Sequence, residues 1–163
     1  MKRKALLVLL GNQLFPIEEI KKTQVDMIFM SEDYDLCTYE KHHKLKILLF
    51  LVAMREKRDE LTANGFKLEY RSLEETPSPR SYEEKLNECI SNNNITEVQM
   101  YEIEDKDFEK RIITFFDNQN IPFKLISSPM FLIKRGDFSK LCGKSSSPKM
   151  AHFYKNVRKK LNI

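Results

Sequence analysis

The stretch ALLVLLGNQ, residues 5–13, decides the fold. Its aliphatic run, Ala5 to Leu10, is far shorter than the roughly 20 apolar residues of a membrane span. Such a run is typical of a strand buried on both faces of a parallel sheet. We therefore expect Gly11, Asn12 and Gln13 to lie at the carboxyl edge of that sheet, where open α/β folds bind ligands.

Four further segments rich in β-branched and aliphatic residues indicate strands, at residues 26–30, 66–71, 96–101 and 123–126. Longer amphipathic stretches separate these segments, and this alternation favours an α/β architecture. We predict a Rossmann-like, five-stranded, mostly parallel sheet with helices on both faces.

Four segments predict helices. The longest, residues 42–64, has apolar residues at three- and four-residue spacing and ends at Gly65. A second follows Pro77-Ser78-Pro79, with Ser81 and Glu84 at the spacing of a capping box. A third opens at Asp105 or Asp107 and ends near Gln119, and a basic helix begins near Lys149.

Composition favours a soluble globular domain. The chain has 163 residues, 41% of them hydrophobic, which suits a single domain with its own core. Its three cysteines are far apart and form no CxxC pair, so we expect no metal or cluster site from this chain alone. No cleavage site follows the first apolar run, and the absence of an export signal and of a disulfide framework predicts a cytoplasmic protein without membrane contact.

Charge divides the chain into two parts. Residues 131–163 hold nine Lys and Arg against a single acidic residue, Asp137, whereas the whole chain has a net charge of +4. We therefore expect an α/β domain over 1–130 and a basic segment over 131–163, which packs on that domain or leads to a further, catalytic one. A basic tail can make weak contact with nucleic acid or an acidic partner, or can simply be solvated.

Polar residues follow the first two predicted strands and precede the longest predicted helix. The turn at Gly11 is either a binding loop or an ordinary strand-to-helix turn, since neither a GxGxxG fingerprint nor a P-loop is present. The acidic loop of Glu32, Asp33 and Asp35 is either part of a site or merely solvated. His42 and His43, at the helix start, can hydrogen-bond a polar ligand but point about 100° apart, which makes them poor joint metal ligands. No GxSxG motif indicates a hydrolase.

Several segments together resemble one family. They are LLVLLGNQLFP (6–16), YEKHHKLKILLFLVAMREKRDEL (39–61), GFKLEYRSLEE (65–75), PMFLIKRGDF (129–138) and KMAHFYKNVRKKLNI (149–163). In this order they are similar to the deoxyribodipyrimidine photolyase-related proteins, also called iron-sulfur bacterial cryptochromes and photolyases.

The resemblance implies an amino-terminal, light-harvesting antenna domain that holds 6,7-dimethyl-8-ribityllumazine. In complete family members an all-helical domain with FAD and a [4Fe-4S] cluster follows, so both groups are expected beyond Ile163, in a flavin-binding photolyase domain that acts with this one. The family is one of DNA repair lyases, but this chain alone is expected to have no catalytic activity.

The family's motifs assign the antenna pocket to particular residues of this chain. They are Gly11, Asn12, Gln13, the stretch Glu32 to Tyr39, His43, Lys46 and Phe50. Asn12 stands where the family generally has Asp, and Phe50 where a smaller aliphatic residue is usual. These two departures support an alternative, a ligand-free remnant or interaction domain that contacts a partner or nucleic acid through its basic tail.

Overall fold

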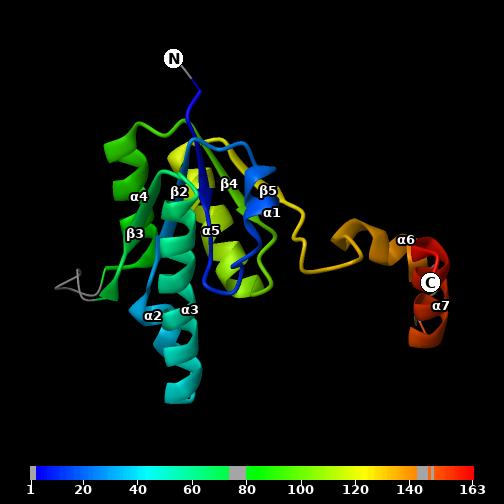
Figure 1. Ribbon diagram of the computed structural model, residues 1–163. Coiled ribbons are helices and arrows are strands. Elements are labelled where there is room, and N and C mark those ends of the chain that lie inside the picture. The colour runs from blue at the N-terminus through cyan, green and yellow to red at the C-terminus, as the bar shows by residue number, and fades with distance from the viewer. Residues whose placement is uncertain (1–2, 74–79, 143–146, 148) are drawn as a thin grey trace. The chain divides into compact units, whose positions relative to one another are not determined.

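A five-stranded parallel sheet forms the centre of the computed structural model, which describes residues 3–73, 80–142, 147 and 149–163 (Figure 1). The strands are β1 (Ala5–Val8), β2 (Met27–Ser31), β3 (Leu68–Arg71), β4 (Glu97–Tyr101) and β5 (Phe123–Ile126). Their order is β3-β2-β1-β4-β5, and every neighbouring pair is parallel. The predicted α/β, Rossmann-like fold and all five predicted strands are confirmed.

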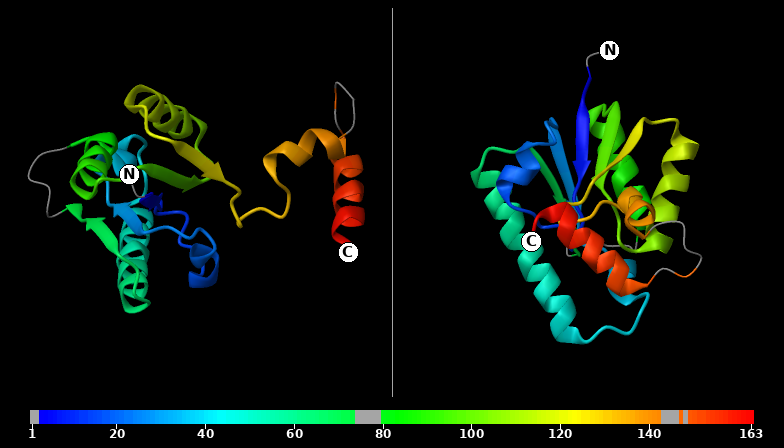
Figure 2. Two further views of the ribbon diagram at one scale, coloured as in Figure 1. Left: turned by 90° about the horizontal axis from the view of Figure 1, so that it is seen from above. Right: turned by 90° about the vertical axis from the view of Figure 1, so that its right-hand side faces the viewer.

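Side chains of β1 alternate between two separate cores because successive residues of a strand point to opposite faces. Leu6 and Val8 join a core with residues of α4 (Tyr82–Asn93) and α5 (Lys106–Gln119). Leu7 joins a second core with α1 (Ile17–Lys21) and α3 (Lys44–Ala63). Figure 2 shows these two helix pairs on opposite sides of the sheet, as predicted.

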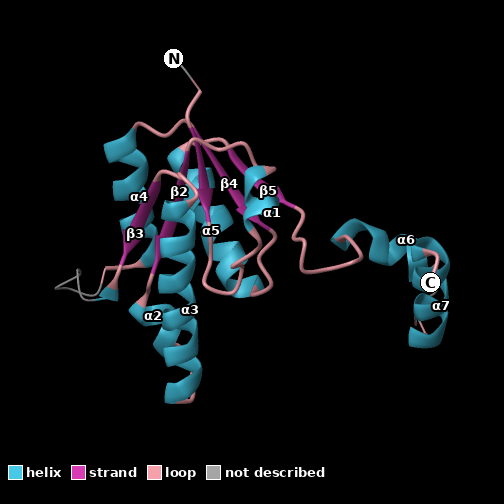
Figure 3. Cartoon of the chain, viewed as in Figure 1, coloured by secondary structure: helices cyan, strands magenta, loops and turns pink. Residues whose placement is uncertain are grey.

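The helix ends follow the capping signals of the sequence (Figure 3). Ser81 accepts a hydrogen bond from the backbone of Glu84, whose side chain bonds back to Ser81, so the predicted capping box opens α4. Asp105 caps α5. The Pro77-Ser78-Pro79 segment that precedes α4 in the sequence lies outside the described residues.

Ser127–Ile163 form a compact unit separate from Met1–Ile126. The first unit thus ends at Ile126, whereas the sequence suggested a division after residue 130. The second unit contains a short 3₁₀ turn (Arg135–Asp137), α6 (Phe138–Cys142) and α7 (Met150–Leu161). The Phe138 and Phe153 rings, 5.1 Å apart, join α6 to α7. Among the described residues, no helix combines the length and apolar character that a membrane crossing requires.

Candidate functional site

A cavity lies at the carboxyl edge of the sheet, in the first unit. The strand order reverses between β1 and β4, because the chain places β2 and β3 on one side of β1 and then β4 and β5 on the other. Ligands of open α/β folds bind beside such a switch point. Residues that follow β1, β2 and β4, including Gly11, Asp33 and Asp105, line this cavity.

The cavity has a volume of about 310 Å³, at the lower end of the range for small-molecule sites. Its walls are largely apolar, from Leu10, Leu36, Ile47, Phe50, Leu51, Met54, Ile103 and Phe108. Most of the wall surface is apolar, although the lining also includes ten residues with polar groups: Asn12, Ser31, Glu32, Asp33, Cys37, Tyr39, His42, Lys46, Tyr82 and Asp105. Walls that combine apolar surface with polar groups suit a ring system that also carries hydrogen-bonding atoms.

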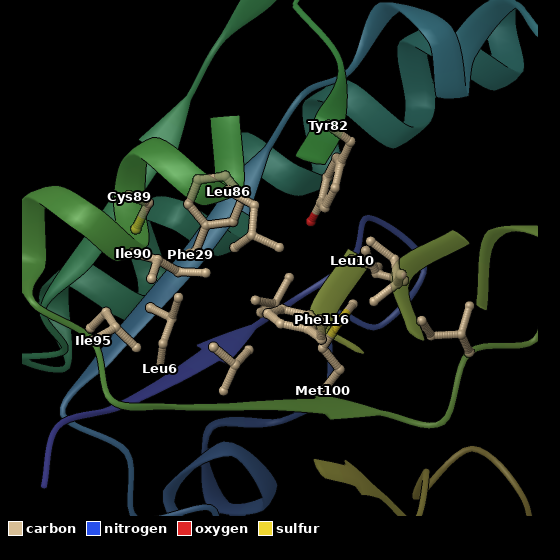
Figure 4. Packing of buried hydrophobic residues seen from close by; sticks show 14 of the residues in the cluster. Leu6, Leu10, Phe29, Tyr82, Leu86, Cys89, Ile90, Ile95, Met100 and Phe116 are labelled. Carbon is tan, nitrogen blue, oxygen red and sulfur yellow. The ribbon is translucent and has the colours of Figure 1, made fainter. Parts of the chain in front are cut away.

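Tyr82, a residue that lines this cavity, has a buried and unsatisfied hydroxyl. The side chain, at the start of α4, is 1% exposed, and its ring packs edge-on against Phe29 and Phe108. Figure 4 shows Tyr82 among the buried hydrophobic residues of the core, with Leu10, another cavity residue, in the same cluster. Within the described part of the chain this hydroxyl has no hydrogen-bond partner. A buried polar group without a partner costs free energy, so a ligand that supplies one is favoured.

Glu32 is buried beneath the cavity and fully engaged by its neighbours. Its Oε1 accepts hydrogen bonds from Arg55 Nε (2.7 Å) and the Tyr70 hydroxyl (2.6 Å). Its Oε2 accepts from Arg55 Nη2 (3.1 Å) and the Leu73 amide (3.0 Å). Burial alone would raise the pKa of Glu32, but these hydrogen bonds outweigh it and lower that pKa. The carboxylate is therefore ionised and connects β2, α3 and β3.

A second buried ion pair holds the loop after β2. Lys85 of α4 contacts the Asp33 carboxylate and donates to the Glu32 carbonyl (3.2 Å), with both charged side chains almost fully buried. Asp33 also caps α2 (Tyr34–Thr38) by accepting from the Leu36 amide (3.0 Å). This loop is thereby fixed from two sides, and the cavity wall that it forms is held in place.

Two titratable groups of the cavity, the Cys37 thiol and the Tyr82 hydroxyl, have raised pKa values. Burial, and then the negative charge of Asp33, raises the pKa values of both Cys37 and Tyr82. Both groups stay protonated near neutral pH, so the thiol is not activated as a nucleophile. Among the described residues, no cluster of His, Cys, Asp and Glu could hold a metal ion.

Nine of the residues assigned from the sequence line this cavity together: Gly11, Asn12, Glu32, Asp33, Leu36, Cys37, Tyr39, Lys46 and Phe50. Phe50 leaves the cavity open. Asn12 donates its amide to Glu104 (2.9 Å), an interaction that an aspartate at this position could not make.

Gln13 and His43 are not among the cavity residues. The Gln13 amide is buried and donates to the Glu102 carbonyl (2.9 Å), which ties the turn after β1 to the end of β4. His43 caps α3, with its ring nitrogen accepting from the Leu45 amide (3.2 Å). His42 lines the cavity in its place, near Lys46 Nζ (3.4 Å).

Sequence reasoning missed Tyr82, Leu51, Met54 and Phe108. The sequence pattern places Met54 and Phe108 at ordinary core positions of their helices, and both side chains are buried. Nothing in the sequence near Tyr82 distinguishes a hydroxyl with a partner from one without, because the surroundings of that hydroxyl come from other segments of the chain.

Comparison with known proteins identifies the family. The family model of the deoxyribodipyrimidine photo-lyase-related proteins matches residues 7–163. A (6-4) photolyase of Agrobacterium fabrum (strain C58 / ATCC 33970) is 25% identical over 162 residues, which are 97% of this chain and 32% of that protein. The chain thus spans about a third of the length of this curated relative. By the extent of the family match, it belongs to the deoxyribodipyrimidine photo-lyase-related protein family.

Proposed function

We propose that this chain is the amino-terminal light-harvesting domain of a cryptochrome- or photolyase-related protein and that its cavity binds 6,7-dimethyl-8-ribityllumazine. Membership of the photolyase-related family supports this proposal, as does the position of the cavity at the switch point of the sheet. The ligand is a flat heterocycle with a hydroxylated side chain. It matches a site whose walls combine apolar surface with hydrogen-bonding groups.

The observation that carries the proposal is the Tyr82 hydroxyl. It is buried, belongs to a residue that lines the cavity, and has no partner among the described residues. Because burial raises the pKa of Tyr82, the group remains a hydrogen-bond donor at neutral pH. A carbonyl oxygen or ring nitrogen of the lumazine is an acceptor for that donor.

The bound lumazine would absorb light and pass the excitation energy on without bond making, so the protein has to hold it rigidly and exclude water. Apolar residues of α3 and α5, among them Phe50 and Phe108, would enclose the ring. The ion pair of Lys85 with Asp33 and the Glu32 network would keep the facing loop fixed.

Fluorescence anisotropy of lumazine titrated with the purified chain tests the proposal. We expect saturable binding at one site per chain. Leu51→Trp places a bulky ring on the cavity wall and should weaken binding at least about tenfold by overpacking the site.

Thr114→Trp is the matched control, because it adds the same ring to an exposed position of α5. It should bind lumazine like the wild type. The absence of any anisotropy change with the folded wild-type chain, or equal binding by the Leu51 variant, would refute the proposal.

A further inference from the structure

Helix α7, in the second unit, has an inner face that packs on α6. The Phe153 ring contacts the ring of Phe138, and the Asn156 amide donates to the Leu141 carbonyl (2.7 Å). At 100° per residue, the half-buried residues of α7 fall within one arc of the helix. They are Phe153, Asn156, Val157 and Leu161. The apolar side of α7 is therefore engaged within its own unit.

The other side of α7 is cationic and exposed. Arg158 lies one turn after Tyr154, whose side chain is 63% exposed, and donates its Nε to the Ile163 carbonyl (3.2 Å). Residues 150–161 include no Asp or Glu. The exposed residues on this side, which we call the basic face, are His152, Tyr154, Lys155, Arg158 and Lys159. An aromatic ring thus lies beside three cations.

The lysines of the basic face have no counter-charge in their own unit. Asp137 is the single acidic residue of 127–163, and its carboxylate contacts Lys160, outside the basic face. Within the described part of the chain, Lys155 and Lys159 have no acidic partner. Their charge is therefore available to an anion from outside the chain.

Helix stability does not account for all of these cations. The helix dipole favours cations near the carboxyl end, which explains Arg158 and Lys159 in the last turn. It does not favour Lys155, in the middle of α7, or Lys149, at the amino end. Like charges four residues apart, such as Lys155 and Lys159, destabilise a helix. A bound polyanion would relieve this repulsion.

We propose that the basic face of α7 binds single-stranded nucleic acid, with its cations on phosphates and Tyr154 stacked on a base. Positive charge without acidic residues is complementary to a phosphate backbone, and every base offers a flat ring to an exposed aromatic side chain. A helix that lies on a membrane buries its apolar face in the lipid, whereas the apolar face of α7 packs on α6. This inference goes beyond the proposed function and concerns the other unit of the chain.

Fluorescence anisotropy tests the inference, with a labelled oligothymidine of about 20 nucleotides, longer than a typical single-strand site, titrated with the full chain. We expect saturable binding at low salt. From about 50 to about 200 mM salt the affinity should fall about twentyfold, the effect of three phosphate contacts on a single strand.

A double charge reversal tests the cations. Lys155→Glu combined with Lys159→Glu should weaken binding by more than about tenfold and flatten its salt dependence. Lys106→Glu combined with Lys110→Glu is the matched control, because it changes the net charge equally at the same spacing on exposed positions of α5. The control should bind the oligonucleotide nearly as the wild type does, and circular dichroism should show that both variants fold normally.

Tyr154→Ala tests the stacking contact. It should weaken binding of the single strand by about five- to tenfold, the loss of one stacked base. Binding of a duplex of the same length should change much less, because paired bases are already stacked on one another. Tyr154→Phe keeps the ring and should bind the single strand like the wild type.

The absence of binding at low salt would overturn the inference, as would a double charge reversal without effect. Equal effects of Tyr154→Ala on single strand and duplex would overturn the assignment to a single strand. Tighter binding of phosphatidylserine-containing vesicles or of polyglutamate would assign the basic face to a membrane or to an acidic protein instead. Lumazine binding does not enter these measurements, so this inference and the proposed function succeed or fail separately.

Discussion

In the proposed lumazine site, the Tyr82 hydroxyl is the buried polar group that a ligand would satisfy. Replacing Tyr82 by Phe removes this oxygen and leaves the packing against Phe29 and Phe108 in place. Because the hydroxyl has no partner among the described residues, we expect the free energy of unfolding to stay the same or rise slightly. Lumazine affinity should fall by about five- to tenfold, the loss of one hydrogen bond worth about 1 kcal/mol.

Tyr70→Phe is the matched control for this prediction. The Tyr70 hydroxyl has a partner, Glu32 (2.6 Å), so its removal should lower the free energy of unfolding and change lumazine affinity much less. Urea unfolding and anisotropy titration give the two quantities. A Tyr82→Phe chain that is clearly less stable than wild type and binds lumazine equally well would contradict this role of the hydroxyl.

At the scale of elements, the Glu32 carboxylate connects β2, α3 and β3 and makes the stability of the fold depend on pH. Its pKa in the folded chain lies below the ordinary value of 4.5. Its contribution to stability is therefore complete above the unfolded pKa, near 4.5, and is lost as the pH falls through the lower folded value.

Glu32→Gln should measure this contribution. At pH 7 the variant should be less stable than wild type by about 2 to 3 kcal/mol, because a buried, hydrogen-bonded partner of Arg55 is lost. The difference should shrink as the pH is lowered below about 4.5. Urea unfolding at several pH values checks this. Glu97→Gln is the control: it breaks the exposed Arg3–Glu97 ion pair and should change the free energy of unfolding only slightly. A difference that stays constant from pH 7 to pH 3 would contradict it.

The elements also show how far sequence reasoning reaches. Long elements such as α3 and the buried strands were predictable because their hydrophobic period or capping residues are local. The helices α1 and α2, five residues each, are too short to show a helical period, and the sequence did not predict them. In the site, the positions of Gly11 and Glu32 were predictable because each follows a strand. The roles of the two histidines were not: His43 caps α3, and its neighbour His42 lines the cavity.

At the scale of the whole molecule, the first unit brings its cavity residues together at one edge of the sheet. The order of the strands reverses at β1, two buried polar networks hold the loop after β2, and α3 lines the cavity with one face while exposing another. The family match relates this chain to about a third of a photolyase. We infer that its task in such a protein is to hold a chromophore rather than to perform bond chemistry.

A crystal structure of the chain with 6,7-dimethyl-8-ribityllumazine tests this claim most directly. The account predicts the ring in the cavity between Phe50 and Phe108, with an acceptor atom of the ligand in hydrogen-bond distance of the Tyr82 hydroxyl. An empty cavity in crystals grown with saturating lumazine, or lumazine bound at another place on the chain, would contradict it.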